Sequence, residues 1–170
     1  MLIQQKAGTL RTIPVNDRVI DRLPLEWYET NKRILRKRSL AGTELALKFL
    51  GEHPRLLQDD VLYHDAQTII AVDIIPCEVL VVTPRSMYEM ASVCYEIGNK
   101  HLPLFYEADA LLVPYEDPLF RLLTAGGYAP VREIKKLLQP LNTSVTPHDT
   151  SGSTSLFSKI LQLTTTTTHV

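Results

Sequence analysis

The sequence predicts an α+β protein in which a small all-β unit precedes a domain of mixed helices and strands. Short segments that alternate bulky and charged residues fill the chain up to about residue 76, and two segments with helical spacing and clear start signals follow. Hydrophobic residues make up 45% of the 170 residues, which suffices to bury a core in one domain or in two small ones.

Alternation predicts the strands of the first half. It runs through LEWYETNKRILRKRSL (25–40) and ELALKFL (44–50), with a turn at AGT between them. The segment LLQDDVLYHDAQTIIAVDII (56–75) continues the pattern and turns near Asp65. Strands this short and this closely spaced predict an N-terminal β domain over residues 1–76.

The segment SMYEMASVCYEIGNKH (86–101) predicts the first helix. Ser86 can cap it, and Glu89 can reach back to the cap nitrogen, which makes a capping box. Pro103 then ends the helix. Four residues recur at helical spacing and are expected to form one stripe, namely Met90, Cys94, Ile97 and His101.

The segment DPLFRLLTAGGY (117–128) predicts the second helix. Asp117 is expected as its N-cap and Pro118 at its first helical position. Gly126 and Gly127 mark its end, because glycine adopts the backbone conformation that closes helices.

Four strands are predicted around these helices. EVLVVTP (78–84) precedes the first helix, LPLFYE (102–107) and ALLVPY (110–115) lie between the two, and VREIKKLLQPL (131–141) can supply a closing strand, although its charge pattern also suits a helix. The order strand, helix, strand, strand, helix, strand is that of the ferredoxin-like βαββαβ motif. We therefore expect a ferredoxin-like domain over residues 77–149.

Composition limits the remaining possibilities. The segments TSVTPHDTSGSTS and LTTTTTHV cannot bury much, which predicts a flexible tail over residues 150–170. A net charge of −1 gives no attraction to nucleic acid or to a membrane surface. Cys77 and Cys94 form no disulfide framework, and the N-terminus has no secretory signal, so we expect a soluble, cytoplasmic protein.

No standard catalytic signature occurs in the sequence. There is no G-x-S-x-G elbow, no H-E-x-x-H helix and no phosphate-binding loop. The adjacent acids Asp59 and Asp60 would point to opposite sides of a strand, so a turn suits them better than acid/base catalysis. We expect a protein that is not an enzyme.

A run of basic residues allows three interpretations. It comprises Lys32, Arg33, Arg36, Lys37 and Arg38. It can be a nucleic-acid patch, but strand alternation divides it between two faces and no stacking aromatic residues accompany it. It can also contact an acidic protein partner, or form a solvated strand face.

His101 is open to two interpretations. A lone histidine at the end of an apolar stripe is often a partly buried core residue. As a metal ligand it needs further ligands, and its own helix does not supply them. Cys94 lies two turns away, roughly 10 Å along the helix axis, so one ion cannot bridge both and Cys94 is expected in the core.

A two-fold axis would solve this shortage of ligands. In an isologous dimer the same surface spot of two chains meets, and one His101 per chain becomes a pair. The negative end of the helix dipole favours a cation there. His148, and with it an oxygen of Asp149, could join from the C-terminal segment. Such a site would suit Ni(II), Zn(II) or Cu(II) rather than Mg or Ca.

The segment CYEIGNKHLPL (94–104) resembles the G-N-[RK]-H signature of the urease accessory protein UreE, a family of nickel metallochaperones. LEWYET (25–30), DDVLYHD (59–65) and TPH (146–148) also fall where that family has similar segments. The resemblance therefore extends over most of the chain.

The resemblance implies a β domain, sometimes called peptide-binding, followed by a ferredoxin-like domain through which the protein forms a homodimer. His101 then corresponds to the histidine that binds nickel across the dimer axis, and His148 to a tail histidine that completes the site. Members pass nickel to the GTPase UreG and, through the accessory complex, to apo-urease. Zinc and copper bind to several members.

Two features differ from the family pattern. The tail lacks the histidine-rich run of some members and offers only His148 and His169, which argues for few ions per dimer. Lys100 replaces the arginine more often found before the histidine, which keeps the charge but loses the planar guanidinium.

Two functional hypotheses follow. In the first, the protein is a dimeric nickel carrier for urease maturation. In the second, it is a protein-binding adaptor whose β domain carries the function, with metal incidental. The contact residues would then be aromatic and basic side chains, namely Trp27, Tyr28, Arg33, Arg36 and Arg38. His53 and His64 are expected at the surface.

Overall fold

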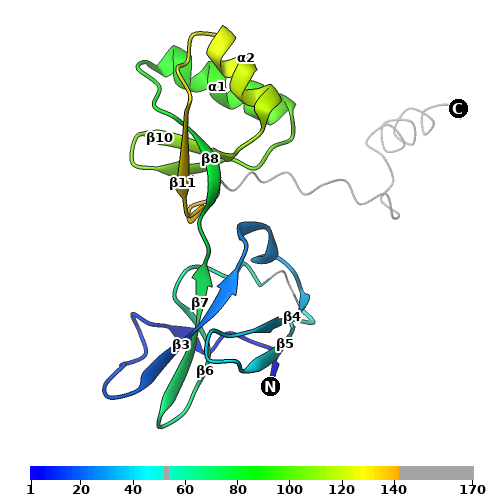
Figure 1. The fold of residues 1–170 in the computed structure, drawn as a ribbon, viewed down its shortest axis with the longest axis vertical. Coiled ribbons are helices and arrows are strands. Elements are labelled where there is room, and N and C mark those ends of the chain that lie inside the picture. Colours follow the sequence, from blue (N-terminus) through cyan, green and yellow to red (C-terminus); the bar gives the residue numbers. More distant parts are fainter. Residues whose placement is uncertain (52–53, 142–170) are drawn as a thin grey trace, which may run out of the picture.

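A computed structural model describes residues 1–51 and 54–141 of the chain, which form two bodies joined end to end (Figure 1). The lower body contains only strands and one short 3-10 helix, and the upper body contains both α-helices. The protein is therefore α+β, as predicted. His53, His148, Asp149, His169 and the predicted tail over 150–170 lie outside the described residues.

The N-terminal body is built from two sheets. One has the strand order β1-β5-β4 and the other β2-β6-β7-β3. Their bounds are β1 Leu2–Ile3, β2 Gly8–Thr9, β3 Val19–Leu25, β4 Ile34–Arg38, β5 Glu44–Lys48, β6 Asp60–His64 and β7 Thr68–Ile74. The alternation seen in residues 34–38 and 44–48 is thus that of paired antiparallel strands, with Leu35 opposite Leu47.

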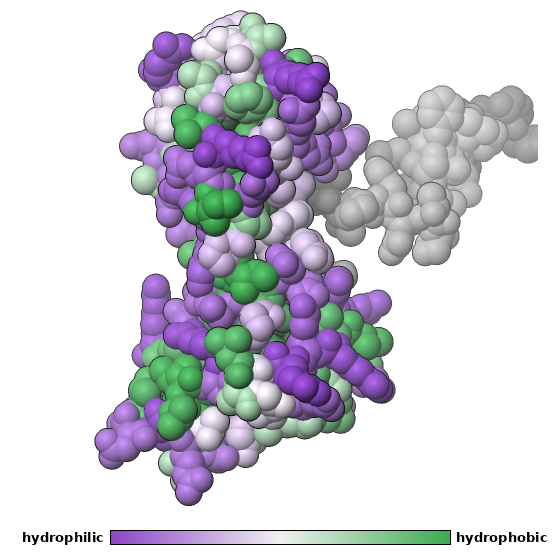
Figure 2. Space-filling model, viewed as in Figure 1, coloured by the Kyte–Doolittle hydropathy of each residue, from purple (hydrophilic) through white to green (hydrophobic). Residues whose placement is uncertain are grey.

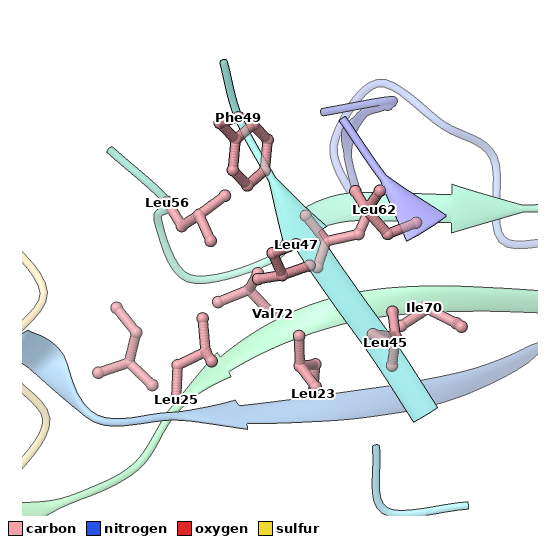
Figure 3. Close-up of a cluster of buried hydrophobic side chains, with 11 residues drawn as sticks. Leu23, Leu25, Leu45, Leu47, Phe49, Leu56, Leu62, Ile70 and Val72 are labelled. Atoms are coloured by element: carbon pink, nitrogen blue, oxygen red, sulfur yellow. The ribbon is translucent and has the colours of Figure 1, made fainter. Parts of the chain in front are cut away.

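The core of this body lies between the two sheets (Figure 3). Strand β5 contributes Leu45 and Leu47 to it while Glu44 and Lys48 face water. Its buried members are Ile3, Leu23, Leu25, Leu45, Leu47, Phe49, Leu56, Leu62, Ile70, Val72 and Ile74. Each side chain of this size contributes about 1.5–3 kcal/mol when fully buried, so a slip of β5 by one residue would be strongly destabilising.

Two features of the first half differ from the prediction. Residues Trp27–Glu29 form a 3-10 helix, η1, where alternation predicted a continuous strand over 25–40. The carboxylate of Glu29 accepts a hydrogen bond from the Glu26 N–H at 3.0 Å and forms an ion pair with the Lys37 ammonium at 2.7 Å. These contacts stabilise a turn between β3 and β4 in place of a continuous strand. In addition, Val19–Leu25 forms β3, which pairs in parallel with β7 and which alternation did not predict.

The second body has the predicted ferredoxin-like topology. Its elements are β8 Cys77–Val82, α1 Met87–Asn99, β9 Phe105–Glu107, β10 Ala110–Pro114, α2 Asp117–Ala125 and β11 Val131–Lys135. The antiparallel sheet order β11-β8-β10-β9 follows from this βαββαβ arrangement. Both helices pack on one face of the sheet (Figure 1), where Val93 and Ile97 of α1 and Leu119 and Leu123 of α2 are buried.

The helix starts agree with the prediction to within one residue. The Ser86 hydroxyl accepts a hydrogen bond from the Glu89 N–H at 3.2 Å, as a cap does. The Glu89 carboxylate, however, accepts from the Arg85 N–H at 2.8 Å, not from the cap nitrogen. Helix α2 has Glu116 as its N-cap, so the prediction of Asp117 was one residue late.

The two bodies touch through a few specific contacts. Strand β7 leads through Ile75 and Pro76 into β8 (Figure 1). The rings of Trp27 and Phe105 meet edge to face with centroids 5.8 Å apart, on the side of the β8 sheet that no helix covers. The Lys136 ammonium pairs with the Asp73 carboxylate at 2.6 Å. Within the described residues, no helix is long and apolar enough to cross a membrane.

Candidate metal centre

His101 lies just beyond the end of helix α1. The helix ends at Asn99, Lys100 is its C-cap, and His101 has a left-handed backbone with φ of 55°. The prediction that the helix runs to residue 101 was therefore wrong. The side chain of His101 is exposed, which excludes the interpretation of His101 as a partly buried core residue.

A Schellman motif explains this geometry. The His101 N–H donates to the Gly98 carbonyl at 3.0 Å, and the Leu102 N–H donates to the Ile97 carbonyl at 3.4 Å. Leu102 then packs on the cluster that contains the buried Ile97. The left-handed turn sends Leu102 into the core and leaves His101 pointing to water.

The residue at this turn is unusual for the conformation. Glycine or asparagine normally occupies it, because a left-handed conformation costs roughly 1–2 kcal/mol for most residues. A histidine at this place gives up backbone stability and gains an exposed imidazole at the negative end of a helix dipole. That end favours a cation.

His101 has no set of ligands around it within the described residues. In residues 1–51 and 54–141 no three His, Cys, Asp or Glu side chains gather as a metal site would require. Cys94 is half-buried against the helix cluster, as predicted, and burial raises the pKa of its thiol. A raised thiol pKa lowers the thiolate fraction, so Cys94 is poorly suited to bind metal. A metal ion at His101 would therefore need ligands from outside these residues.

The chain passes close to His101 again at the end of the described residues. The Leu141 N–H donates to the Leu104 carbonyl at 2.7 Å, and the Tyr106 N–H donates to the Gln139 carbonyl at 3.0 Å. Leu104 lies within about 11 Å of His101, because three Cα–Cα steps of about 3.8 Å join them. Leu141, the last described residue, therefore lies within roughly 17 Å of His101, and His148, Asp149 and His169 follow it in the sequence.

An exposed apolar stripe, which the helical spacing described above did not predict, covers the outer face of α1. Tyr88, Ala91, Tyr95 and Gly98 recur at 3-4-3 spacing and are all exposed, with Tyr88 at 80% and Tyr95 at 69%. The opposite face of the helix is the buried one. Apolar residues at both helix faces are the signal that points to a second contact surface.

The basic run is divided between two faces, as alternation predicted. Lys37 points inward to Glu29, whereas Arg36 and Arg38 face water from the same strand. Arg38 pairs with Glu44 on the neighbouring strand. Arg33 precedes the strand and is also exposed.

The two aromatic candidates for partner contact have different surroundings. Trp27 is half-buried at the junction of the two bodies, against Phe105. Tyr28 is exposed, and the Lys32 ammonium lies 5.4 Å from the centre of its ring.

The remaining titratable candidates have structural roles. Asp60 is buried and pairs with Lys6 at 3.0 Å, and Asp59 pairs with Arg22 from a turn. His64 is exposed, as predicted, and its Nδ1 lies 3.4 Å from a guanidinium nitrogen of Arg18.

Both bodies have relatives among known proteins. The family model for the N-terminal domain of the UreE urease accessory protein matches residues 3–74, and the model for its C-terminal domain matches residues 77–158. The urease accessory protein UreE of Flavobacterium johnsoniae is 49% identical over 96% of this chain and 99% of its own length. That of Actinobacillus pleuropneumoniae is 42% identical over 76% of this chain and 70% of its own length. That of Acetivibrio thermocellus is 34% identical over 90% of this chain and 99% of its own length.

Proposed function

This chain belongs to the family of urease accessory proteins UreE, and on that premise we propose that it is a nickel metallochaperone. It binds Ni(II) through His101 where two copies meet and donates the ion during assembly of the urease metallocentre. It performs no covalent chemistry and acts in the cytoplasm. Zn(II) or Cu(II) can occupy the same site, because imidazole nitrogen suits all three ions.

The geometry of His101 is the observation that carries the proposal. An exposed imidazole stands on a left-handed turn at a helix C-terminus, at a cost to backbone stability that packing does not repay. An exposed site that is shared between two chains can take up an ion and release it again. A carrier needs such a site, since it must load and unload its ion.

The outer stripe of α1 supports a homodimer. An isologous interface brings the same helix face of two copies together, and Tyr95 and Gly98 then form part of its centre. Gly98 accepts the hydrogen bond of His101, so the stripe ends at the metal candidate. A two-fold axis near Gly98 would place one His101 from each copy at a common ion.

The length of chain after Leu141 supports a ligand from the C-terminal segment. His148 is the seventh residue after Leu141, and seven extended residues span at most about 25 Å. Because Leu141 is bonded to Leu104, His148 can reach His101 of its own copy or of a partner across a two-fold axis. Asp149 and His169 are further candidate ligands from the same segment.

Delivery requires recipients. We propose that these are the accessory GTPase UreG and the complex of accessory proteins with apo-urease. The family name, urease accessory protein, supports a role in urease assembly. A contact with these partners also gives a role to the exposed Arg33 and Arg36 of the first body, which could meet an acidic surface.

A protein-binding adaptor is the second candidate function. The exposure of Tyr28, Arg33 and Arg36, all on the N-terminal body, favours it. Capture of the recipient by the intact protein in the presence of a chelator, unchanged in His101→Asn and lost in Arg36→Glu, would support the adaptor. Capture that requires nickel would support the carrier.

Calorimetric nickel titration of the intact protein and of His101→Asn tests the proposal directly. Asparagine tolerates the left-handed turn but offers no imidazole, so the fold persists while the ligand is lost. His64→Asn is the matched control, because His64 is exposed in the other body. We expect one tight ion per dimer, lost in His101→Asn and kept in His64→Asn. Equal binding by all three proteins would overturn the assignment.

A further inference from the structure

A groove of about 710 Å³ lies where the two bodies meet. Residues of η1 and of 55–57 line one side of it, and residues 103–106 and 137–140 line the other. Figure 2 shows apolar surface at the level of this junction, between the upper and the lower body. The volume is that of a site for a ligand or a short peptide segment.

The groove presents apolar side chains to water. Tyr28, Leu57, Tyr106 and Leu138 line it and are 38–52% exposed. Trp27 and Phe105 also line it, with their edge-to-face contact. Apolar surface gathered in one groove indicates a binding site, because single exposed apolar residues are common but grouped ones are not.

The chain itself supplies an occupant. Residues 137–140 form part of the groove wall, so residues 142–170 start beside it. They contain one apolar stretch, LFSKILQL (156–163), among mostly polar residues. At about 100° per residue, its five apolar side chains fall within one arc of about 160°, and its polar residues fall in the remaining arc. That pattern is typical of a helix that buries one face.

We propose that residues 156–163 bind as a helix in the groove between the two bodies, with Phe157, Ile160 and Leu161 against its apolar wall. The connector 142–155 is rich in Ser and Thr, and the random-coil relation for Gly/Ser-rich linkers gives an end-to-end distance of roughly 20 Å for its length. A tether of this length keeps the segment at millimolar effective concentration. A free peptide of another protein would displace the segment only at a higher concentration or with a higher affinity for the groove.

Binding of this segment has a consequence for the metal site, which rests on the proposed function. Pro103 lines the groove and lies two residues after His101. When residues 156–163 are bound, both ends of the connector lie at the groove, and His148 in the middle of it is held near His101. Segment binding and nickel binding therefore strengthen each other.

Trp27 reports on the groove, because it is the single tryptophan of the chain and lines the groove wall. The experiment compares the emission and the acrylamide quenching of Trp27 in three full-length proteins, all with chelator present. They are the intact protein, the apolar-face variant Phe157→Ser/Leu161→Ser and the polar-face control Lys159→Ser. We expect a red shift and stronger quenching in the apolar-face variant alone, reversed by an added synthetic peptide of residues 154–165.

Three results would overturn the proposal. Identical emission and quenching in all three proteins would show that residues 156–163 do not occupy the groove. A difference that appears only as protein concentration rises would assign the groove to the segment of a second copy. Equal changes in Lys159→Ser and in the apolar-face variant would show that no specific face is bound.

A nickel titration separates this proposal from the proposed function. The fluorescence comparison uses no metal, so its outcome does not depend on nickel binding. Weaker nickel binding in Phe157→Ser/Leu161→Ser than in Lys159→Ser would support the coupling to His148. Equal affinity in these two variants would overturn the coupling, and loss of nickel binding in the intact protein would overturn the carrier function itself.

Discussion

The His101 N–H donates to the Gly98 carbonyl at 3.0 Å, and this bond places His101 outside helix α1 with a left-handed backbone. The imidazole is therefore exposed at the helix end and is not part of the apolar stripe of Met90, Cys94 and Ile97. The left-handed backbone of His101 lowers the free energy of unfolding. A substitution at this position measures that cost independently of metal binding.

Replacing His101 by glycine should keep or increase stability and remove nickel binding. Glycine adopts a φ of 55° without strain, and the relief is expected to be about 1 kcal/mol. His101→Val should destabilise by at least as much, since a β-branched side chain is strained there. Urea unfolding of the metal-free proteins checks the order glycine, histidine, valine. A glycine variant clearly less stable than the intact protein would show that the His101 side chain contributes to packing.

Nickel affinity should fall below about pH 6. An imidazole must lose its proton before it binds a metal, so protons compete with nickel as the pH falls. Calorimetric titrations at pH 7.5, 6.5 and 5.5 in matched buffers, as rough steps across the ordinary histidine range, measure the dependence. Affinity that stays constant over this range would indicate carboxylate oxygens, not imidazole nitrogen, as the dominant ligands.

The junction between the two bodies should weaken in acid. Burial alone would raise the pKa of Asp73, but hydrogen bonds from Lys136 and Gln58 outweigh it and hold the pKa below its ordinary value of 3.8. A lowered carboxyl pKa contributes stability that is present above the ordinary pKa and is lost as the pH falls through the native one. Stability should therefore decrease below about pH 4.

Asp73→Asn should lose stability at pH 7 and show a smaller decrease in acid. We expect a loss of about 1 kcal/mol, because both partners of the ion pair are partly exposed. Glu44→Gln is the control for loss of an ion pair away from the junction, since Glu44 pairs with Arg38 within one body and both side chains are more than half exposed. Urea unfolding at pH 7 and at pH 3 measures both variants. Equal pH dependence of Asp73→Asn and the intact protein would contradict this account.

A charge on the outer stripe of α1 should separate the proposed dimer. Tyr95→Glu places a carboxylate on the exposed apolar face, and in an isologous interface two such charges would meet. Light scattering should then give the mass of one chain, with unchanged helix content by circular dichroism. Leu40→Glu is the control, because Leu40 is equally exposed but lies in the other body. An unchanged mass in Tyr95→Glu would exclude α1 from the interface.

Periodicity predicted where elements begin better than where they end. The hydroxyl of Ser86 and the proline at 118 act within one turn, so their effect is visible in a few letters of sequence. The end of α1 depends on Leu102 finding the cluster around Ile97, which lies on two helices and a sheet. Helical spacing through His101 carried no information on that contact, and the helix was predicted two residues too long.

Alternation had a similar limit in the first half. Residues 25–40 were predicted as one strand, yet the carboxylate of Glu29 bonds to the Glu26 N–H and to Lys37 eight residues later, and the chain turns there. Alternation predicted that the charged side chain of Glu29 faces water, but Glu29 is only 7% exposed in the folded protein. Burial of a charge next to its partner is decided by tertiary contacts, which no period reveals.

By itself the sequence determined the α+β class, the ferredoxin-like order of the second body and the choice of His101 as the residue to examine, because local propensities and spacing act over short stretches. The tertiary structure decided that His101 is exposed on a left-handed turn and that the outer face of α1 exposes apolar side chains. It also decided that residues near 27, 56, 105 and 138 enclose one groove. These properties arise from contacts between segments far apart in the chain, and only folding brings such segments together.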